Sequence, residues 1–286
     1  MTTPTPSPKI LVGVDGSTTS ANALRWATRL AEDTSGAVTA TMAWSYPTAL
    51  LMPVIGAPVL PAEDLSEVTR ATLEALVAAT PNSDSVTEQW VIMGAPRSVL
   101  TESSGDHDVL VLGRTGRNRL QRAWLGSTAS YCVRHAACPV VIVGESTAPE
   151  STITVAVDGS LSSIEALVWA LGLGYDHDVL AVYSHDEWEL DDLPLDDRIR
   201  QDLDKNADEL VAGVVEAAIE RTGADEDRIT RQVRQGDPRT TIVEQADPSE
   251  LLVLGAQGHS GLARWFLGSL ADYAVHHAPG SVAIWR

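Results

Sequence analysis

Residues 109–127 read VLVLGRTGRNRLQRAWLGS, and residues 251–269 read LLVLGAQGHSGLARWFLGS. Each stretch is an apolar run followed by three glycines and a serine in the spacing G-x2-G-x9-G-S, and the two copies lie 142 residues apart. One copy could arise by chance, because glycine makes up about 7% of an average protein. Two copies at matching places indicate a duplicated domain.

The rest of the chain repeats at nearly the same interval. The sequence VGVDGS at 12–17 returns as VAVDGS at 155–160, and GAPR at 94–97 returns as GDPR at 236–239. We therefore predict two domains in tandem, residues 1–145 and 152–286, each large enough to bury its own core. The small and polar residues around Pro149 form the expected linker.

Within each domain, apolar runs alternate with amphipathic stretches in the order βαβαβαβαβ. The apolar runs are nearly continuous, which is typical of strands buried on both faces. This pattern predicts an α/β fold: two tandem Rossmann-like domains, each an open parallel five-stranded sheet with helices on both faces and right-handed crossovers. The expected strands of domain one are 10–14, 38–44, 86–92, 109–112 and 140–143, and the expected helices are 21–31, 65–79, 97–102 and 128–135.

Composition excludes nonspecific nucleic-acid binding as the function. A net charge of -19, from 20 basic and 39 acidic side chains, repels nucleic-acid phosphates. Sixteen of the acids lie between Asp186 and Asp227, either as a solvated helix face or as a docking surface for a basic partner.

Targeting signals and cysteines bear on the compartment. We expect no export signal in residues 1–8 and no membrane helix in residues 49–62, an apolar stretch that prolines interrupt and that we interpret as a flap or packing surface. Cys132 and Cys138 are the only cysteines, so we expect structural thiols and a reducing cytoplasm.

The duplicated motifs fall at one edge of the predicted sheets. Ligands of open α/β sheets bind beyond the carboxyl ends of the strands, where the fourth strand ends at Gly113 or Gly255. Glycines let the main chain approach a ligand closely, and a following helix N-terminus attracts anions. We predict a phosphate cradle in each domain; the alternative is that these glycines make tight turns and that Ser127 and Ser269 only cap helices.

The first strand of each domain ends in a carboxylate, Asp15 or Asp158. Such a group can accept a hydrogen bond from a ribose hydroxyl or an adenine amino group. The alternative is an Asp-Gly-Ser turn that starts the next helix, and both roles are compatible. Domain one has more cations in its glycine loop, which predicts tighter triphosphate binding there. The alternative is that these arginines are exposed side chains without a binding role. The compared residues are Arg114, Arg117, Arg119 and Arg122 in domain one and Gln257, His259 and Arg264 in domain two.

These motifs in combination resemble the universal stress protein family, specifically its tandem-domain, ATP-binding type found in actinobacteria, over about residues 9–286. The resemblance implies a cytoplasmic regulatory protein that binds ATP, with or without Mg²⁺, in each domain. It also implies a strand order of 3-2-1-4-5 and a homodimer formed by the last strand. Domain two has PGSV at 279–282 where domain one has ACPV at 137–140, so we expect a short final strand that leaves the usual dimer edge of domain two in doubt.

Site residues follow from the resemblance by position. Asp15 and Asp158 would contact adenosine, and Ala43 and Ser184 would contact adenine. The phosphates and ribose would be held by Gly113, Gly116, Arg117, Gly126, Ser127 and Thr128 in domain one, and by Gly255, Gly258, His259, Gly268, Ser269 and Leu270 in domain two.

The sequence has no Walker motif and no G-x-S-x-G elbow, so we assign no catalytic residue. No histidine, cysteine and aspartate set has metal-ligand spacing, and we expect no metal site in the protein itself. Three functions remain: a nucleotide-responsive regulator with an unknown protein partner, a slow ATPase or nucleotidyl-transfer enzyme, and a scaffold that binds no nucleotide. We favour the regulator, because no general base or metal-anchoring carboxylate accompanies the predicted cradle.

Overall fold

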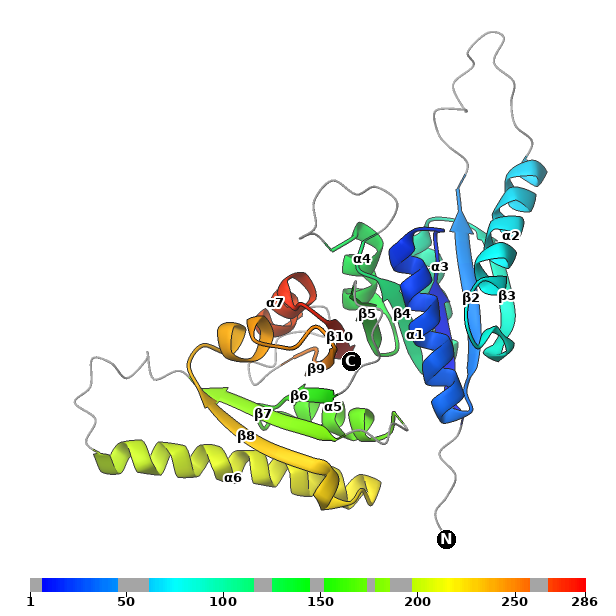
Figure 1. Ribbon diagram of the computed structural model, residues 1–286. Helices are drawn as coiled ribbons and strands as arrows, with labels where there is room; N and C mark the ends of the chain where they lie inside the picture. The colour runs from blue at the N-terminus through cyan, green and yellow to red at the C-terminus, as the bar shows by residue number, and fades with distance from the viewer. Residues whose placement is uncertain are drawn as a thin grey trace. The chain divides into compact units, whose positions relative to one another are not determined.

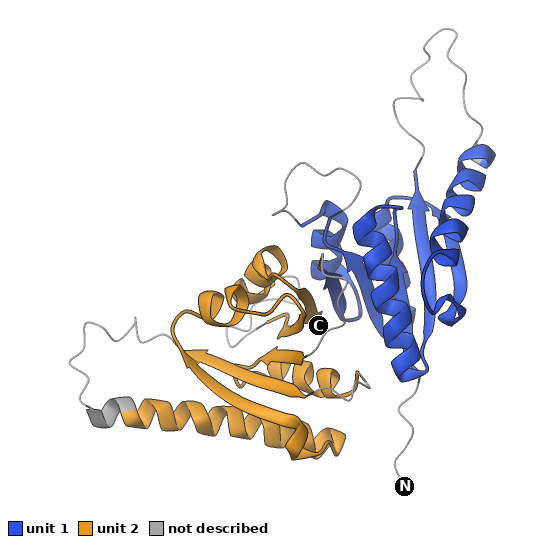
Figure 2. Cartoon of the chain, viewed as in Figure 1, with its two compact units in different colours: residues 1–143 blue, residues 144–286 orange. Residues whose placement is uncertain are grey.

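The computed structural model describes residues 7–45, 62–115, 125–144, 152–173, 178–185, 197–257 and 267–286, without the side chains of Ala62 and 197–200. The chain divides into two compact units, residues 1–143 and 144–286 (Figure 2). The expected linker and residues 49–61 lie outside the described residues.

Unit 1 is a parallel sheet with helices on both faces, as predicted (Figure 1). The strand order is β3-β2-β1-β4-β5, which confirms the order 3-2-1-4-5. The elements are β1 (Lys9–Gly13), α1 (Thr18–Thr34), β2 (Ala37–Trp44), α2 (Ala62–Ala78), η2 (Ser83–Ser85), β3 (Val86–Met93), α3 (Pro96–Ser103), η3 (Ser104–Asp106), β4 (Val109–Gly113), α4 (Ser127–His135) and β5 (Val140–Val143).

Unit 2 repeats this arrangement, with its strands in the order β8-β7-β6-β9-β10. The expectation of a short final strand in domain two is wrong. Strand β10 has five residues, all paired with β9, whereas β5 has four. The elements are β6 (Thr152–Ala156), α5 (Leu161–Leu171), β7 (Val179–His185), α6 (Asp197–Thr222), η5 (Glu226–Arg228), β8 (Ile229–Gln235), the π-helix η6 (Arg239–Glu244), β9 (Glu250–Gly255), α7 (Ser269–His277) and β10 (Ser281–Trp285).

The two sheets have equivalent registers around the first strand. Val12 lies opposite Ala40 on β2 and Val111 on β4. Val155 in unit 2 lies opposite Ala181 and Val253. All of these side chains are fully buried, because helices cover both faces of each central strand.

A cation over an aromatic ring joins helices α3 and α4 in unit 1. The Arg97 guanidinium lies 5.4 Å from the centre of the Tyr131 ring, which stacks on His135 at 4.0 Å. The equivalent contacts in unit 2 join η6 to α7, where Arg239 lies 5.5 Å from the Tyr273 ring. Because a cation over an aromatic ring is attractive by about 0.5–1 kcal/mol at exposed sites, the repeated contact fastens two helices to each other.

Within the described residues, no helix combines the length and the apolar character that crossing a membrane requires.

Candidate functional site

The carboxylate that follows the first strand of each unit shapes a turn. Asp15 Oδ1 accepts the Ser17 N–H at 2.9 Å, and Asp158 Oδ1 accepts the Ser160 N–H at 2.9 Å. Ser17 and Ser160 in turn cap helices α1 and α5. The turn that we considered as an alternative is therefore confirmed, and it occupies one oxygen of each half-buried carboxylate.

The glycine at the end of the fourth strand is required by a neighbouring helix. A Cβ on Gly113 would lie 2.6 Å from the carbonyl carbon and oxygen of Thr19, in the first turn of α1. A Cβ on Gly255 would likewise lie 2.9 Å from the carbonyl carbon of Ser162 in α5. Contacts this short do not occur for real Cβ atoms, so both positions need glycine whether or not a ligand binds.

The loop after the fourth strand is closed at its base in the same way in both units. The Gly126 N–H donates to the Arg114 carbonyl at 2.8 Å, and the Gly268 N–H donates to the Ala256 carbonyl at 2.8 Å. In unit 1 the Thr19 hydroxyl also donates to the Thr115 carbonyl. The remainder of the loops lies outside the described residues, and with it the predicted site residues Gly116, Arg117, Gly258 and His259.

The helix that follows each loop begins without a side-chain cap. Gly126 and Gly268 occupy the capping positions of α4 and α7, so the alternative that the serines cap these helices is wrong. Ser127 and Ser269 are the first helical residues and are exposed, and neither hydroxyl has a hydrogen-bond partner among the described residues. The first-turn N–H groups have no intrahelical acceptor, which leaves each helix N-terminus with partial positive charge.

The two helix starts differ in charge. The described base of the loop has a half-buried Arg114 in unit 1 and Ala256 at the same place in unit 2. Helix α7 has Asp272 in its first turn, whereas α4 has no acid there. The remaining predicted residues of the two starts, Thr128 and Leu270, are half-buried. Unit 1 therefore offers the more positive helix start.

The ends of the second strands also differ. Ala43 is half-buried on β2. Ser184 on β7 is buried, and its hydroxyl donates to the Gly236 carbonyl at 2.6 Å and lies 2.8 Å from the Thr241 Oγ1. The Ser184 hydroxyl is thus already satisfied inside unit 2, and Ala43 has no equivalent polar group.

Both cysteines are buried free thiols, as expected. Burial, with a smaller contribution from Cys138, raises the pKa of Cys132 to about 12. The thiol is therefore protonated and unreactive at neutral pH. Among the described residues, no group of three or more histidine, cysteine, aspartate or glutamate side chains could hold a metal ion.

Sequence reasoning missed two hydroxyl positions beside the site. Thr19 and Ser162 lie against the glycine that ends the fourth strand, and Ser20 and Ser163 close the turn after Asp15 and Asp158. The signal was available, because both hydroxyl pairs recur at the same distance after the repeated Asp-Gly-Ser.

Both halves of the chain match known proteins. The universal stress protein family model matches residues 7–144 and again residues 151–286. One universal stress protein of Mycobacterium tuberculosis is 27% identical over 299 residues, covering 97% of this chain and 96% of its own length. Another from that species is 28% identical over 207 residues, covering 68% of each chain.

Among solved structures, a universal stress protein from Archaeoglobus fulgidus is similar over 98% of this chain and 96% of its own, with a TM-score of 0.62 and 15% identity. That likeness concerns the fold. The two matches of the family model span nearly the whole sequence and fall on the two halves of the repeat. The chain therefore belongs to the universal stress protein family.

Proposed function

We propose that each unit binds an adenine nucleotide, ATP in the first instance, and that the protein is a nucleotide-responsive regulator. The observation that carries this proposal is the duplicated, uncapped helix start at Gly126 and Gly268, reached through a loop that is closed at its base in both units. Such a helix start is an anion site by virtue of its N–H groups and dipole.

The described residues suit the two ends of a nucleotide. The N–H groups of Ser127 and Thr128 would hold phosphate oxygens, and the free Ser127 hydroxyl would bind phosphate or a Mg²⁺ ion that accompanies it. The carboxylate of Asp15, which follows β1, is a group suited to accept a hydrogen bond from a ribose hydroxyl or an adenine amino group. Ala43 would contribute apolar contact to the base. The same roles fall to Ser269, Leu270 and Asp158 in unit 2.

We propose that unit 1 binds the triphosphate more tightly. Arg114 adds positive charge at the base of its loop, whereas unit 2 has Ala256 there and Asp272 in the first turn of α7. Ser184, which is held by Gly236 and Thr241, would offer the base no free hydroxyl in unit 2.

Calorimetric titration of the full chain with ATP tests these proposals, together with mass identification of any small molecule that co-purifies. Two binding events, with the stronger one weakened in Ser127→Asp and unchanged in Ser269→Asp, would support both proposals. Absence of heat and absence of a co-purified nucleotide would refute nucleotide binding. Equal affinities at the two sites would refute only the difference between units.

We also propose domain limits at 1–145 and 152–286, a cytoplasmic location, and a homodimer formed by the last strand of a domain. Buried free thiols in unit 1 support a reducing compartment. Light scattering of the purified chain tests the dimer, and a molar mass near that of one chain would refute it.

A further inference from the structure

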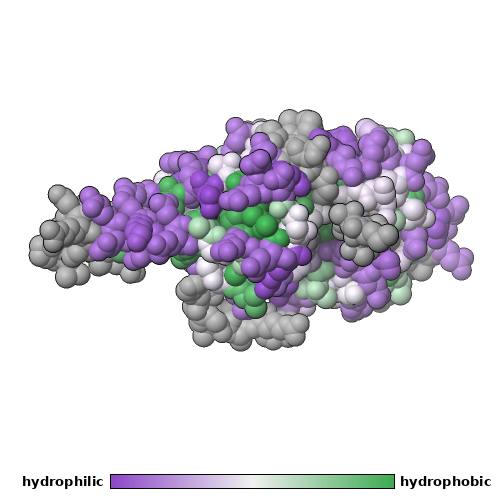
Figure 3. All heavy atoms as spheres, turned by 90° about the horizontal axis from the view of Figure 1, so that it is seen from below, coloured by the Kyte–Doolittle hydropathy of each residue, from purple (hydrophilic) through white to green (hydrophobic). Residues whose placement is uncertain are grey.

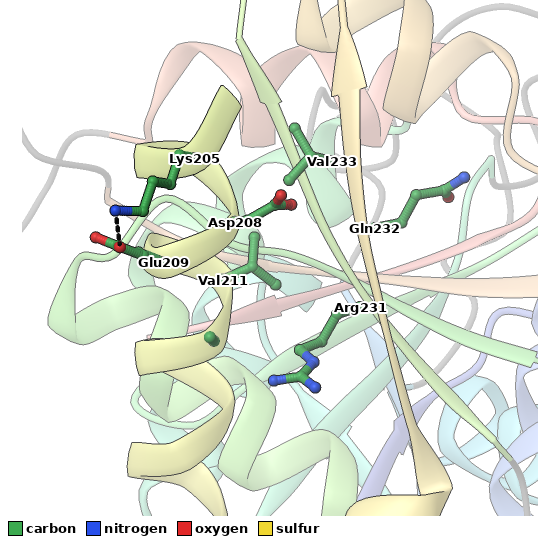
Figure 4. A pocket seen from close by; sticks show the side chains of 8 residues that line it. Lys205, Asp208, Glu209, Val211, Arg231, Gln232 and Val233 are labelled. Atoms are coloured by element: carbon green, nitrogen blue, oxygen red, sulfur yellow. Dashed lines mark ion pairs between the residues drawn. The ribbon is translucent and has the colours of Figure 1, made fainter. Parts of the chain in front are cut away.

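A groove of about 390 Å³ lies between helix α6 and strand β8 in unit 2. Figure 4 shows Asp208 and Val211 pointing from α6 toward β8, while Gln232 points away on the other side of the strand. Val211, Ala212 and Val233 give the groove an apolar lining, and its polar lining residues are Lys205, Asp208, Glu209, Arg231 and Gln232.

Strand β8 forms one border of this groove and is the edge strand of its sheet. All seven residues of Ile229–Gln235 pair with β7 in an unshifted parallel register, and no described strand pairs with the other side. The strand contains no proline, and Thr230, Arg231 and Gln232 are exposed. An edge of this kind presents unpaired N–H and C=O groups that can accept an additional strand.

The charges around the groove favour a basic occupant. Each cation on the rim is matched by an acid: Lys205 lies 3.5 Å from Glu209, and Arg231 lies 3.5 Å from Glu226. Asp208 is exposed and has no ion pair or hydrogen bond with the described residues. Among the described residues of the rim, Asp208 is therefore an uncompensated charge.

The rest of α6 reinforces this charge. Over Gln201–Thr222 the helix carries six acidic and two basic side chains, all exposed. Seen from below, the surface of the chain is largely hydrophilic with a smaller hydrophobic area (Figure 3). Arg221 is paired with Glu165 of α5 at 2.6 Å, so it does not offset the acids near the groove. A positively charged segment in the groove would be attracted mainly by the acids that line it, Asp208 and Glu209, and less by the more distant ones.

We propose that the α6–β8 groove binds an extended, lysine-bearing segment of a partner protein, which adds to the open edge of β8 as a strand. Alternate apolar side chains of that segment would contact Ala212 and Val233, which are half-buried, and a lysine would face Asp208. Main-chain hydrogen bonds would supply affinity and the alternate side chains would supply selectivity. This site uses no residue of the nucleotide proposal, and the two can fail independently.

The probe is a fluorescent eight-residue peptide of alternating lysine and valine, titrated against the full chain by anisotropy at low salt. A peptide of alternating glutamate and valine is the control. We expect saturable binding of the lysine peptide alone. Asp208→Lys should weaken it by on the order of tenfold, since a charge reversal replaces an attraction with a repulsion. Glu220→Lys makes the same charge change on the same helix but does not line the groove, and it should change the affinity less than twofold.

Two further measurements locate the peptide. Ala212→Trp fills the groove without changing charge and should abolish binding, with circular dichroism and the melting temperature checking that the variant is folded. Hydrogen exchange should slow at 229–235 and stay unchanged at 86–93, the equivalent edge strand of unit 1. Equal effects of Asp208→Lys and Glu220→Lys, equal binding of the glutamate peptide, or protection at 86–93 in place of 229–235 would overturn the proposal.

Discussion

Placing a carboxylate at the start of helix α4 should weaken nucleotide binding and stabilise the fold at the same time. Ser127 is the first helical residue, is exposed, and follows a glycine cap that contributes no side-chain hydrogen bond. An aspartate there interacts favourably with the helix dipole, by about 0.3–1 kcal/mol. A phosphate bound at the same N–H groups would meet that aspartate at close range.

The repulsion can be estimated from the separation of the charges. Two unit charges about 4 Å apart interact by roughly 4 kcal/mol at an effective dielectric constant of about 20. Because Ser127 is exposed, solvent screening reduces this to about 1–2 kcal/mol, which corresponds to roughly a fivefold to thirtyfold loss of affinity. The equivalent change in unit 2 is Ser269→Asp.

The assay is isothermal calorimetry with ATP on the full chain, alongside urea unfolding of each variant. Ser127→Asn and Ser269→Asn are matched controls, since asparagine has the shape of aspartate without its charge, and both should bind ATP within about threefold of the parent. If the double aspartate variant is stabilised as expected but binds ATP like the parent chain, the helix starts are not the phosphate sites.

Three other predictions concern the fold around the site. Gly113→Ala should destabilise unit 1 by about 1–3 kcal/mol in urea unfolding, because its Cβ would meet the Thr19 carbonyl group, whereas Gly105→Ala, with open space around it, should change stability by less than about 0.5 kcal/mol; equal effects would contradict the contact. Arg97→Gln should lower the stability of the fold by about 0.5–1 kcal/mol through loss of the contact with the Tyr131 ring, and Tyr131→Phe, which keeps the ring, should lower it less. Thermal unfolding measures both, and a loss in Tyr131→Phe as large as that in Arg97→Gln would show that the ring contact is unimportant. The pKa of Cys132 is raised to about 12 from an ordinary 9.0, so the unfolded chain releases this proton at a lower pH than the folded chain. Stability should therefore fall as pH rises from about 9 toward 12, by up to about 1.4 kcal/mol per pH unit. A Cys132→Ala variant whose stability falls with the same slope would show that this thiol is not responsible.

The repeat and the element order were readable from the sequence because they depend on local patterns. Apolar runs such as 109–112 and 140–143 became strands with nearly the expected limits, since strands buried on both faces need continuous apolar residues. The Asp-Gly-Ser turns were also readable, because Asp15 bonds to a residue only two positions away. The role of glycine as the cap of α4 was not predicted, since either Gly126 or Ser127 fits the first helical turn.

The tertiary structure alone decided which residues far apart in the chain contact each other. Gly113 must be glycine because Thr19, 94 residues earlier, lies against it, and no local pattern records that approach. The hydroxyl of Ser184 forms hydrogen bonds with Gly236 and Thr241, which lie more than fifty residues later in the chain. The groove beside Asp208 depends on how α6 packs against β8, which the sequence pattern of neither element specifies. Sequence periodicity specifies which face of an element is buried, whereas the partners of each side chain depend on how the elements meet in space.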